Sequence, residues 1–205
     1  MNGTDLPETI RAFVAIQLPQ ELLDSLQTVQ QRLQSGLPKD AVRWTAPEHL
    51  HLTLKFLGNI STNSLGELTM ALEEACRNSA PLLLRAEGFG CFPSSSRPKV
   101  IWAGLKGGLA ELEALQSRID AAMQPWCERK EERPFRPHLT IGRVRTASPR
   151  TGRQLGEKLK AVSVSKPGEW SVRQVHLMRS QLSPNGATHT VLASAPLARP
   201  GSVQA

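Results

Sequence analysis

The tripeptide His-Leu-Thr occurs twice in this sequence, beginning at His51 and at His138, and a branched aliphatic residue follows each copy. Side chains alternate between the two faces of a strand, so each copy would place its histidine and its threonine, Thr53 or Thr140, on one face. Imidazole titrates near neutral pH and can accept or donate a proton, while a hydroxyl can hydrogen-bond to a phosphate oxygen. Two such strands side by side would hold the groups that cleave a phosphodiester, one imidazole acting as base and the other as acid.

The elements that would position these residues alternate along the chain. Strands are expected at residues 10–16, 41–44, 50–58, 82–89, 99–105, 137–144, 169–182 and 188–194, the last two forming a hairpin around 183–187. Helices are expected at 20–33, 64–76, 109–123 and 153–161. Ser64 and Glu67 predict a capping box at the start of the second helix. Each half of the chain contains one copy of the tripeptide, so we expect a single two-lobed α+β domain over residues 1–195 and a flexible tail at 196–205.

The overall charge favours an anionic partner. The chain has 25 Lys and Arg against 18 Asp and Glu, which gives a net charge of +7 and an isoelectric point near 9.8. This excess is typical of proteins that bind RNA, nucleotides or phosphate esters. The three cysteines form no Cys-x-x-Cys pair, and no segment resembles a signal peptide or a membrane span. We therefore expect a cytoplasmic protein that does not associate with membranes.

A metal site is an alternative use of the first tripeptide, because His49 and His51 form a His-x-His pair that a strand would aim to one side. The next carboxylate after this pair is Glu67, and His176 and His189 are the only other spare imidazoles. His49 is more simply a residue that enters the strand. We expect no metal and no cofactor.

Four longer segments carry a family resemblance. They are RAFVAI at 11–16, RWTAPEHLHLTLKFLG at 43–58, RPFRPHLTIGRVR at 133–145 and VHLMRSQLSPNGATHTVL at 175–192. Together they resemble the 2H phosphoesterase superfamily, and within it the bacterial and archaeal RNA 2′,3′-cyclic phosphodiesterases, also called 2′-5′ RNA ligases. The resemblance implies an enzyme with an α+β fold of two pseudo-symmetric lobes, in which antiparallel sheets form a central cleft flanked by helices. We also expect a monomer.

The resemblance also implies a role for each site residue. His51 would be the proton donor to the leaving 3′ oxygen, and His138 the proton acceptor that activates water. The product would be an RNA or nucleotide 2′-phosphate. Thr53 and Thr140 would bind the phosphate, and Arg143 matches a family arginine that contacts the substrate phosphate.

Two of the implied positions depend on local strand geometry. An unbroken strand would place Arg143 on the opposite face from His138, so its role requires a twist or a bulge, for example at Gly142. Phe56 could stack on a base of the substrate, but its position in the strand fits a core role equally well. The chain contains no tyrosine, whereas the family often has one near the C-terminal strand, where His189 or a neighbour would fill the space.

Two other functions remain open at this level. The family includes 2′-5′ RNA ligase activity on ends like those of tRNA halves, and the sequence does not set the direction of the reaction. A non-catalytic RNA-binding module would explain the positive charge but not the paired histidines. The expected partners are RNA or nucleotides with 2′,3′-cyclic phosphate ends.

Overall fold

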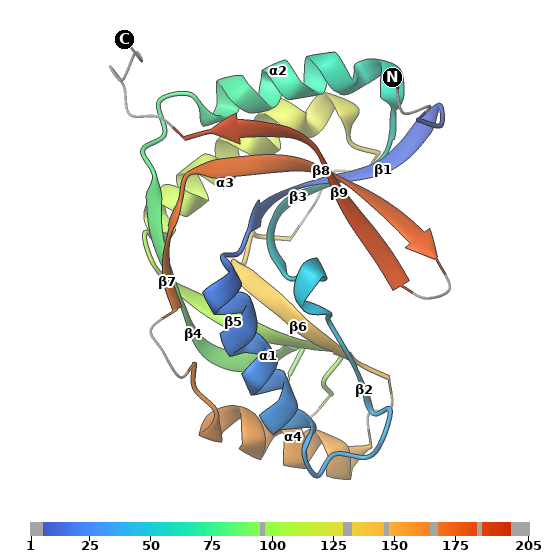
Figure 1. Ribbon diagram of the computed structural model, residues 1–205, viewed down its shortest axis with the longest axis vertical. Helices are drawn as coiled ribbons and strands as arrows, with labels where there is room; N and C mark the ends of the chain where they lie inside the picture. Colours follow the sequence, from blue (N-terminus) through green and yellow to red (C-terminus); the bar gives the residue numbers. More distant parts are fainter. Residues whose placement is uncertain are drawn as a thin grey trace.

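Nine strands and four α-helices make up residues 6–94, 97–128, 133–145, 148–164, 168–183 and 186–197, the part of the chain that the computed structural model describes (Figure 1). The strands are β1 Thr9–Gln17, β2 Val42–Trp44, β3 His51–Ser61, β4 Leu82–Phe92, β5 Val100–Gly107, β6 His138–Val144, β7 Gly168–Val172, β8 Gln174–Ser183 and β9 Gly186–Pro196. The helices are α1 Gln20–Gln34, α2 Leu65–Cys76, α3 Leu109–Met123 and α4 Pro149–Ala161. Short 3-10 turns lie at Pro47–His49, Thr62–Ser64 and Gln124–Trp126.

The strands form one antiparallel sheet in the order β7-β4-β5-β6-β3-β1-β8-β9, and β2 pairs with β6. The two halves of the sheet meet at β3 and β6, where Leu52 lies opposite Leu139. The α2 and α3 helices lie along the half that contains β1, β8 and β9, whereas α1 and α4 lie with the half that contains β4 and β5 (Figure 1). The predicted α+β class with antiparallel strands and flanking helices is confirmed.

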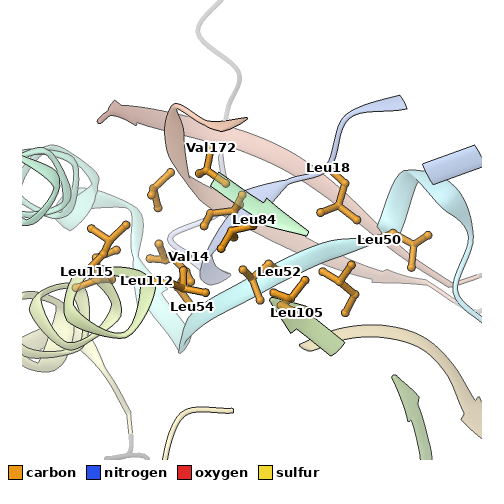
Figure 2. Close-up of a cluster of buried hydrophobic side chains, with 14 of the residues drawn as sticks. Val14, Leu18, Leu50, Leu52, Leu54, Leu84, Leu105, Leu112, Leu115 and Val172 are labelled. Carbon is orange, nitrogen blue, oxygen red and sulfur yellow. The ribbon is translucent and has the colours of Figure 1, made fainter. Parts of the chain in front are cut away.

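All four helices contribute to one hydrophobic core on one face of the sheet. Leu54 of β3 lies beside Leu112 and Leu115 of α3, and Leu52 lies near Leu105 of β5 (Figure 2). A second, small cluster of Phe13, Ala15 and Met178 contains strand residues only. The sheet therefore has a helix-covered face and a second face on which no helix residue joins the buried apolar cluster.

Three predictions of local structure are wrong, and β3 and β4 each continue three residues beyond their expected ends. The Ser64 side chain makes no cap hydrogen bond, and the preceding 3-10 turn begins instead where Ser61 Oγ accepts from the Asn63 amide at 3.3 Å. The α4 helix begins earlier than expected, because Ser148 caps it and a proline occupies its first turn. The expected strand at 169–182 breaks at Arg173, since β7 pairs with β4 and β8 pairs with β1 on the other half of the sheet.

Two further expectations concern the C-terminal region. Residues 184 and 185, in the expected hairpin turn, and residues 198–205 of the expected tail lie outside the described residues. The β9 strand extends to Pro196, and Leu197 is buried and donates its amide to the Arg173 carbonyl at 2.8 Å. No helix of the described residues is long and apolar enough to cross a membrane.

Candidate active site

The junction of β3 and β6 places the two His-Leu-Thr copies side by side. Leu52 and Leu139 are register partners and both are fully buried. Because the strands are antiparallel, this register sets the polar neighbours of Leu52 opposite those of Leu139. His51 therefore faces Thr140, and Thr53 faces His138, on the face of the sheet opposite the core. The predicted pairing of the two motifs follows from this one contact between the halves.

A β-bulge in β6 brings Arg143 to the same face as the histidine of its strand. Trp102 of β5 lies opposite Thr140 and Val100 lies opposite Arg143, so Ile141 is an extra residue in β6. Val100 and Trp102 are two residues apart and share one face of β5. Thr140 and Arg143 therefore share that face as well, as the assignment of Arg143 required. The extra residue is Ile141, next to the Gly142 that the sequence suggested.

The same irregularity occurs in β3. Ala15 of β1 lies opposite Thr53, and Phe13 lies opposite Phe56, which leaves Leu54 as the extra residue of the first bulge. Phe56 therefore shares a face with Thr53 rather than with the core, and its side chain is 61% exposed. The core role that its position in the sequence equally allowed is wrong, because the bulge inverts the alternation.

Both histidines are held in the same way. His51 donates from Nδ1 to the His49 carbonyl at 2.8 Å, and His138 donates from Nδ1 to the Arg136 carbonyl at 2.7 Å. A carbonyl can only accept, so in each neutral ring the proton resides on Nδ1 and Nε2 carries the lone pair. Each imidazole is thus fixed in orientation and keeps Nε2 for proton exchange with a ligand.

A phenylalanine supports each imidazole. The Phe13 ring lies 4.9 Å from the His51 ring between centroids, and the Phe92 ring lies 5.1 Å from the His138 ring. Phe92 also contacts Trp102 at 5.4 Å. These aromatic contacts restrict the rotation of both imidazoles and reduce their access to water.

His189 is a residue of this site to which the sequence assigned no chemical role. Its ring lies 5.2 Å from His51, 5.0 Å from His49 and 5.0 Å from Phe13, measured between ring centroids. The β8–β9 hairpin brings His189 close to His51, because His189 on β9 pairs with Ser180 on β8. The only sign of this in the sequence was the absence of tyrosine, since the family that the chain resembles often has a tyrosine near the C-terminal strand.

The surroundings of His51 favour its neutral form. Burial, followed by the neighbouring His189, lowers the pKa of His51 to about 4, although the hydrogen bond to the His49 carbonyl acts in the opposite direction. Burial and then His49 also lower the pKa of His189. Without a ligand, His51 is therefore uncharged near pH 7.

Further residues of β2 and β8 lie near this centre. His176 shares the site face through its pairing with Ala15, and its Nδ1 lies 2.9 Å from Ser194 Oγ. Arg43 of β2 lies directly opposite Arg143. Trp44 lies on the other face, where it packs near Gly142.

The metal alternative lacks a complete ligand set. Within the described residues, no group of three or more His, Cys, Asp or Glu side chains is arranged to hold a metal ion. His49 lies in the 3-10 turn before β3 rather than on the strand, and its ring packs against His189.

A sequence model of the 2′-5′ RNA ligase superfamily matches residues 18–184, which is most of the chain and includes both His-Leu-Thr copies. The chain belongs to this superfamily. Two proteins similar to this chain are named RNA 2′,3′-cyclic phosphodiesterase. The protein of Methanothermobacter thermautotrophicus is 32% identical over 88% of this chain and 95% of its own length, and that of Thermus thermophilus is 30% identical over 89% and 88%.

Two solved structures share the fold of this chain. TT0787 of Thermus thermophilus superposes with a TM-score of 0.75 at 28% identity, covering 92% of this chain and 98% of that one. LigT of E. coli, solved in complex with 3′-AMP, superposes with a TM-score of 0.73 over 94% of this chain and 100% of that one. At 23% identity the likeness to LigT shows the fold alone.

Proposed function

We propose that this protein hydrolyses RNA and nucleoside 2′,3′-cyclic phosphodiesters to 2′-phosphomonoesters by acid–base catalysis with two histidines. The observation that supports it most directly is the matched arrangement of His51 and His138. Each projects from one of two adjoining strands and donates from Nδ1 to a carbonyl two residues earlier in the chain. In-line displacement at phosphorus requires one proton to be removed and another to be supplied on opposite sides, which a single imidazole cannot do.

The proposed reaction balances in one displacement. Nε2 of His138 takes a proton from water, whose oxygen forms a bond to phosphorus. The bond from phosphorus to the 3′ oxygen breaks, and Nε2 of His51 supplies the proton that this oxygen requires. The phosphate remains on the 2′ oxygen, and the two imidazoles exchange protons with solvent before the next turnover. The resemblance to the 2H family supports this assignment of donor and acceptor.

Three further residues would bind the reacting phosphate. Thr53 and Thr140 lie beside the histidines on the same face and can donate hydroxyl protons to the non-bridging oxygens. The bulge places the Arg143 guanidinium on this face, where it can balance the charge that develops on the oxygens in the transition state. Exposed Phe56 would stack on a base of the substrate.

Because the pKa of His51 is low, the ring would have to take up a proton from solvent when the substrate binds. An anionic phosphate within hydrogen-bonding distance favours the imidazolium, which raises the pKa of the ring in the complex. The buried ring would thus be neutral in the free protein and protonated when a cyclic phosphate is bound. His51 would then carry a positive charge only while the phosphate that it protonates is bound.

Loss of either imidazole tests this proposal. His51→Ala and His138→Ala should each lower turnover of a nucleoside 2′,3′-cyclic phosphate by roughly a hundredfold or more, the usual scale of general acid–base effects. The double variant should be little worse than either single variant, because residues that act as one unit are not additive. His176→Ala is the control on the same face and should retain activity. A folded His138→Ala protein with near-parental turnover would refute the mechanism.

A further inference from the structure

The β6 bulge at Ile141 and the first β3 bulge at Leu54 each accept a hydrogen bond from a glutamine of a helix on the core side. Gln30 of α1 donates from Nε2 to the Ile141 carbonyl at 2.8 Å. Gln116 of α3 donates from Nε2 to the Leu54 carbonyl at 3.2 Å. Ile141 has no register partner in β5 and Leu54 has none in β1, so these two are the extra residues of the bulges. The helix amides therefore supply hydrogen bonds at the points where the ladder is interrupted.

The side-chain amide of Gln30 is buried and uses both of its N–H groups in hydrogen bonds. Its side chain is 5% exposed, and the same amide nitrogen donates to the Thr45 carbonyl at 2.7 Å. The Thr45 backbone amide in turn donates to the Ile141 carbonyl at 3.0 Å. A buried amide whose two N–H groups both have acceptors is fixed in orientation, and it joins α1, the segment before β3 and the bulge of β6.

The two arrangements correspond position by position. In each strand the bulged residue is the third after the histidine, and its carbonyl accepts from a glutamine of the helix that covers that half. The fifth residue after the histidine, Phe56 or Arg143, then returns to the face of the histidine. Without the extra residue, strand alternation would turn that side chain towards the core.

We propose that Gln30 and Gln116 are positioning residues that act through Arg143 and Phe56. Each stabilises the bulged register over the regular one, and so keeps the phosphate-binding or base-stacking side chain beside its histidine. The expected loss of activity rests on the proposed function, whereas the expected change in strand register does not. Removing the amide donor leaves a buried carbonyl without one of its hydrogen bonds and weakens the preference for the bulge.

The experiment replaces each glutamine with methionine, which has a similar length and no donor. Gln30→Met should lower kcat/KM for a nucleoside 2′,3′-cyclic phosphate about tenfold, and Arg143→Ala about a hundredfold. If Gln30 acts through Arg143, the double variant falls no more than about threefold below Arg143→Ala alone. An additive loss of about a thousandfold in the double variant would overturn the proposal for Gln30.

The other half of the molecule provides the matched comparison. Gln116→Met should raise KM with kcat within about twofold, and it should be less than additive with Phe56→Ala. The crossed pair of Gln30→Met with Phe56→Ala should be additive, since these residues serve different strands. Gln31→Met carries the same substitution at the exposed neighbouring position of α1 and should leave activity unchanged. Coupling in the crossed pair as strong as in the matched pairs would show a general loss of stability and refute a positioning role.

A crystal structure of the Gln30→Met protein gives a readout independent of activity. We expect the pairing of Val100 with Arg143 to be lost or present in only part of the molecules. An unchanged register with full occupancy would overturn the inference whatever the kinetics show. A parent protein that turned over no cyclic phosphate would instead refute the proposed function, and this structural test would still decide the role of Gln30.

Discussion

The ring of His189 lies edge-on against the ring of His51, with 5.2 Å between the centroids and 77° between the planes. Phe13 contacts both rings, so the proposed general acid lies in an apolar environment beside a second imidazole. Burial and the neighbouring His189 lower the pKa of His51 to about 4. This pKa lies below that of an ordinary solvent-exposed histidine, so protonation of His51 near neutral pH would require an anion beside the ring.

The titration of His51 should therefore change when an anion binds. In the free protein, NMR detection of the imidazole nitrogens should show His51 neutral from pH 8 to about pH 5, since its pKa is about 4. Saturation with a nucleoside 2′-phosphate should raise this pKa towards neutrality, because the phosphate charge favours the imidazolium. An unchanged pKa in the complex would contradict the assignment of His51 as proton donor.

His189→Phe separates the two causes of the low pKa. Phenylalanine keeps an aromatic ring against His51 and removes only the second titrating group. The pKa of His51 should then rise in the free protein but remain below its ordinary value, because burial is the larger cause. A return to the ordinary value of 6.5 would show that His189, rather than burial, controls this ring.

The same pKa makes the stability of the fold depend on pH. His51 binds a proton below about pH 6.5 in the unfolded chain but only below about pH 4 in the folded protein. The unfolded state therefore binds more protons in this interval, and the free energy of unfolding falls as the pH decreases from 6.5 to 4. The contribution of His51 to this change is no more than about 3 to 4 kcal/mol. Denaturant titrations should show that the free energy of unfolding depends less on pH in His51→Gln than in the parent protein. An equal dependence on pH in the two proteins would contradict the low pKa of His51.

Most of the architecture around this site could be predicted from hydrophobic periodicity. The α3 helix has the predicted bounds, and the buried leucines of both His-Leu-Thr copies face the core. The sequence suggested a bulge in β6 only because of the role expected of Arg143, and it did not predict the bulge of β3 at Leu54. Periodicity within one strand does not locate an extra residue, and the glutamines that donate to the Ile141 and Leu54 carbonyls, Gln30 and Gln116, lie far from them in the sequence.

Other features that sequence periodicity missed also depend on contacts between residues far apart in the sequence. His189 reaches His51 only through the register of the β8 and β9 hairpin. The break at Arg173 reflects the passage of the chain from one half of the sheet to the other. Local patterns describe single elements, whereas these features depend on which elements become neighbours.

Hydrolysis should not require a divalent metal. The proposed proton transfers use two imidazoles, and hydroxyl and guanidinium groups bind the phosphate, so excess EDTA should leave turnover of a cyclic phosphate unchanged. The assay compares initial rates before and after chelation and after addition of zinc or manganese. Activity that disappears with EDTA and returns with metal would favour the pair His49 and His51 as metal ligands.

The residues proposed to bind the phosphate should contribute unequally to turnover. Arg143→Ala should lower turnover about a hundredfold, as loss of a group that stabilises transition-state charge does. Its free energy of unfolding should change by less than about 0.5 kcal/mol, because the side chain is exposed. Thr53→Ala and Thr140→Ala should cost less than the loss of either histidine.

The matched control for Arg143 is Arg32→Ala. Arg32 is also an exposed arginine, but it lies on α1, which packs on the helix-covered face of the sheet. The control removes the same charge from the protein and should leave turnover unchanged. If both variants lost activity equally, the effect would come from net charge rather than from a contact of Arg143 with the phosphate.

Arg43 and Arg143 face each other directly across β2 and β6 and are both exposed. Among the described residues neither guanidinium has an ion-pair partner. Like charges at directly opposite positions in a sheet repel each other, and a bound anion relieves that repulsion. If Arg143 holds the reacting phosphate, Arg43 lies next to it and should contact the phosphodiester on the 5′ side of the terminal nucleotide of an RNA.

Substrates of two lengths distinguish this contact from a contact with the reacting phosphate. Arg43→Ala should lower kcat/KM about tenfold for a short RNA with a 2′,3′-cyclic end, but less than twofold for a nucleoside 2′,3′-cyclic phosphate, which has no second phosphate. The dependence of the RNA reaction on salt should also become weaker, because one fewer phosphate is neutralised. Equal losses on both substrates would place Arg43 at the reacting phosphate, and no loss on either would remove it from the site.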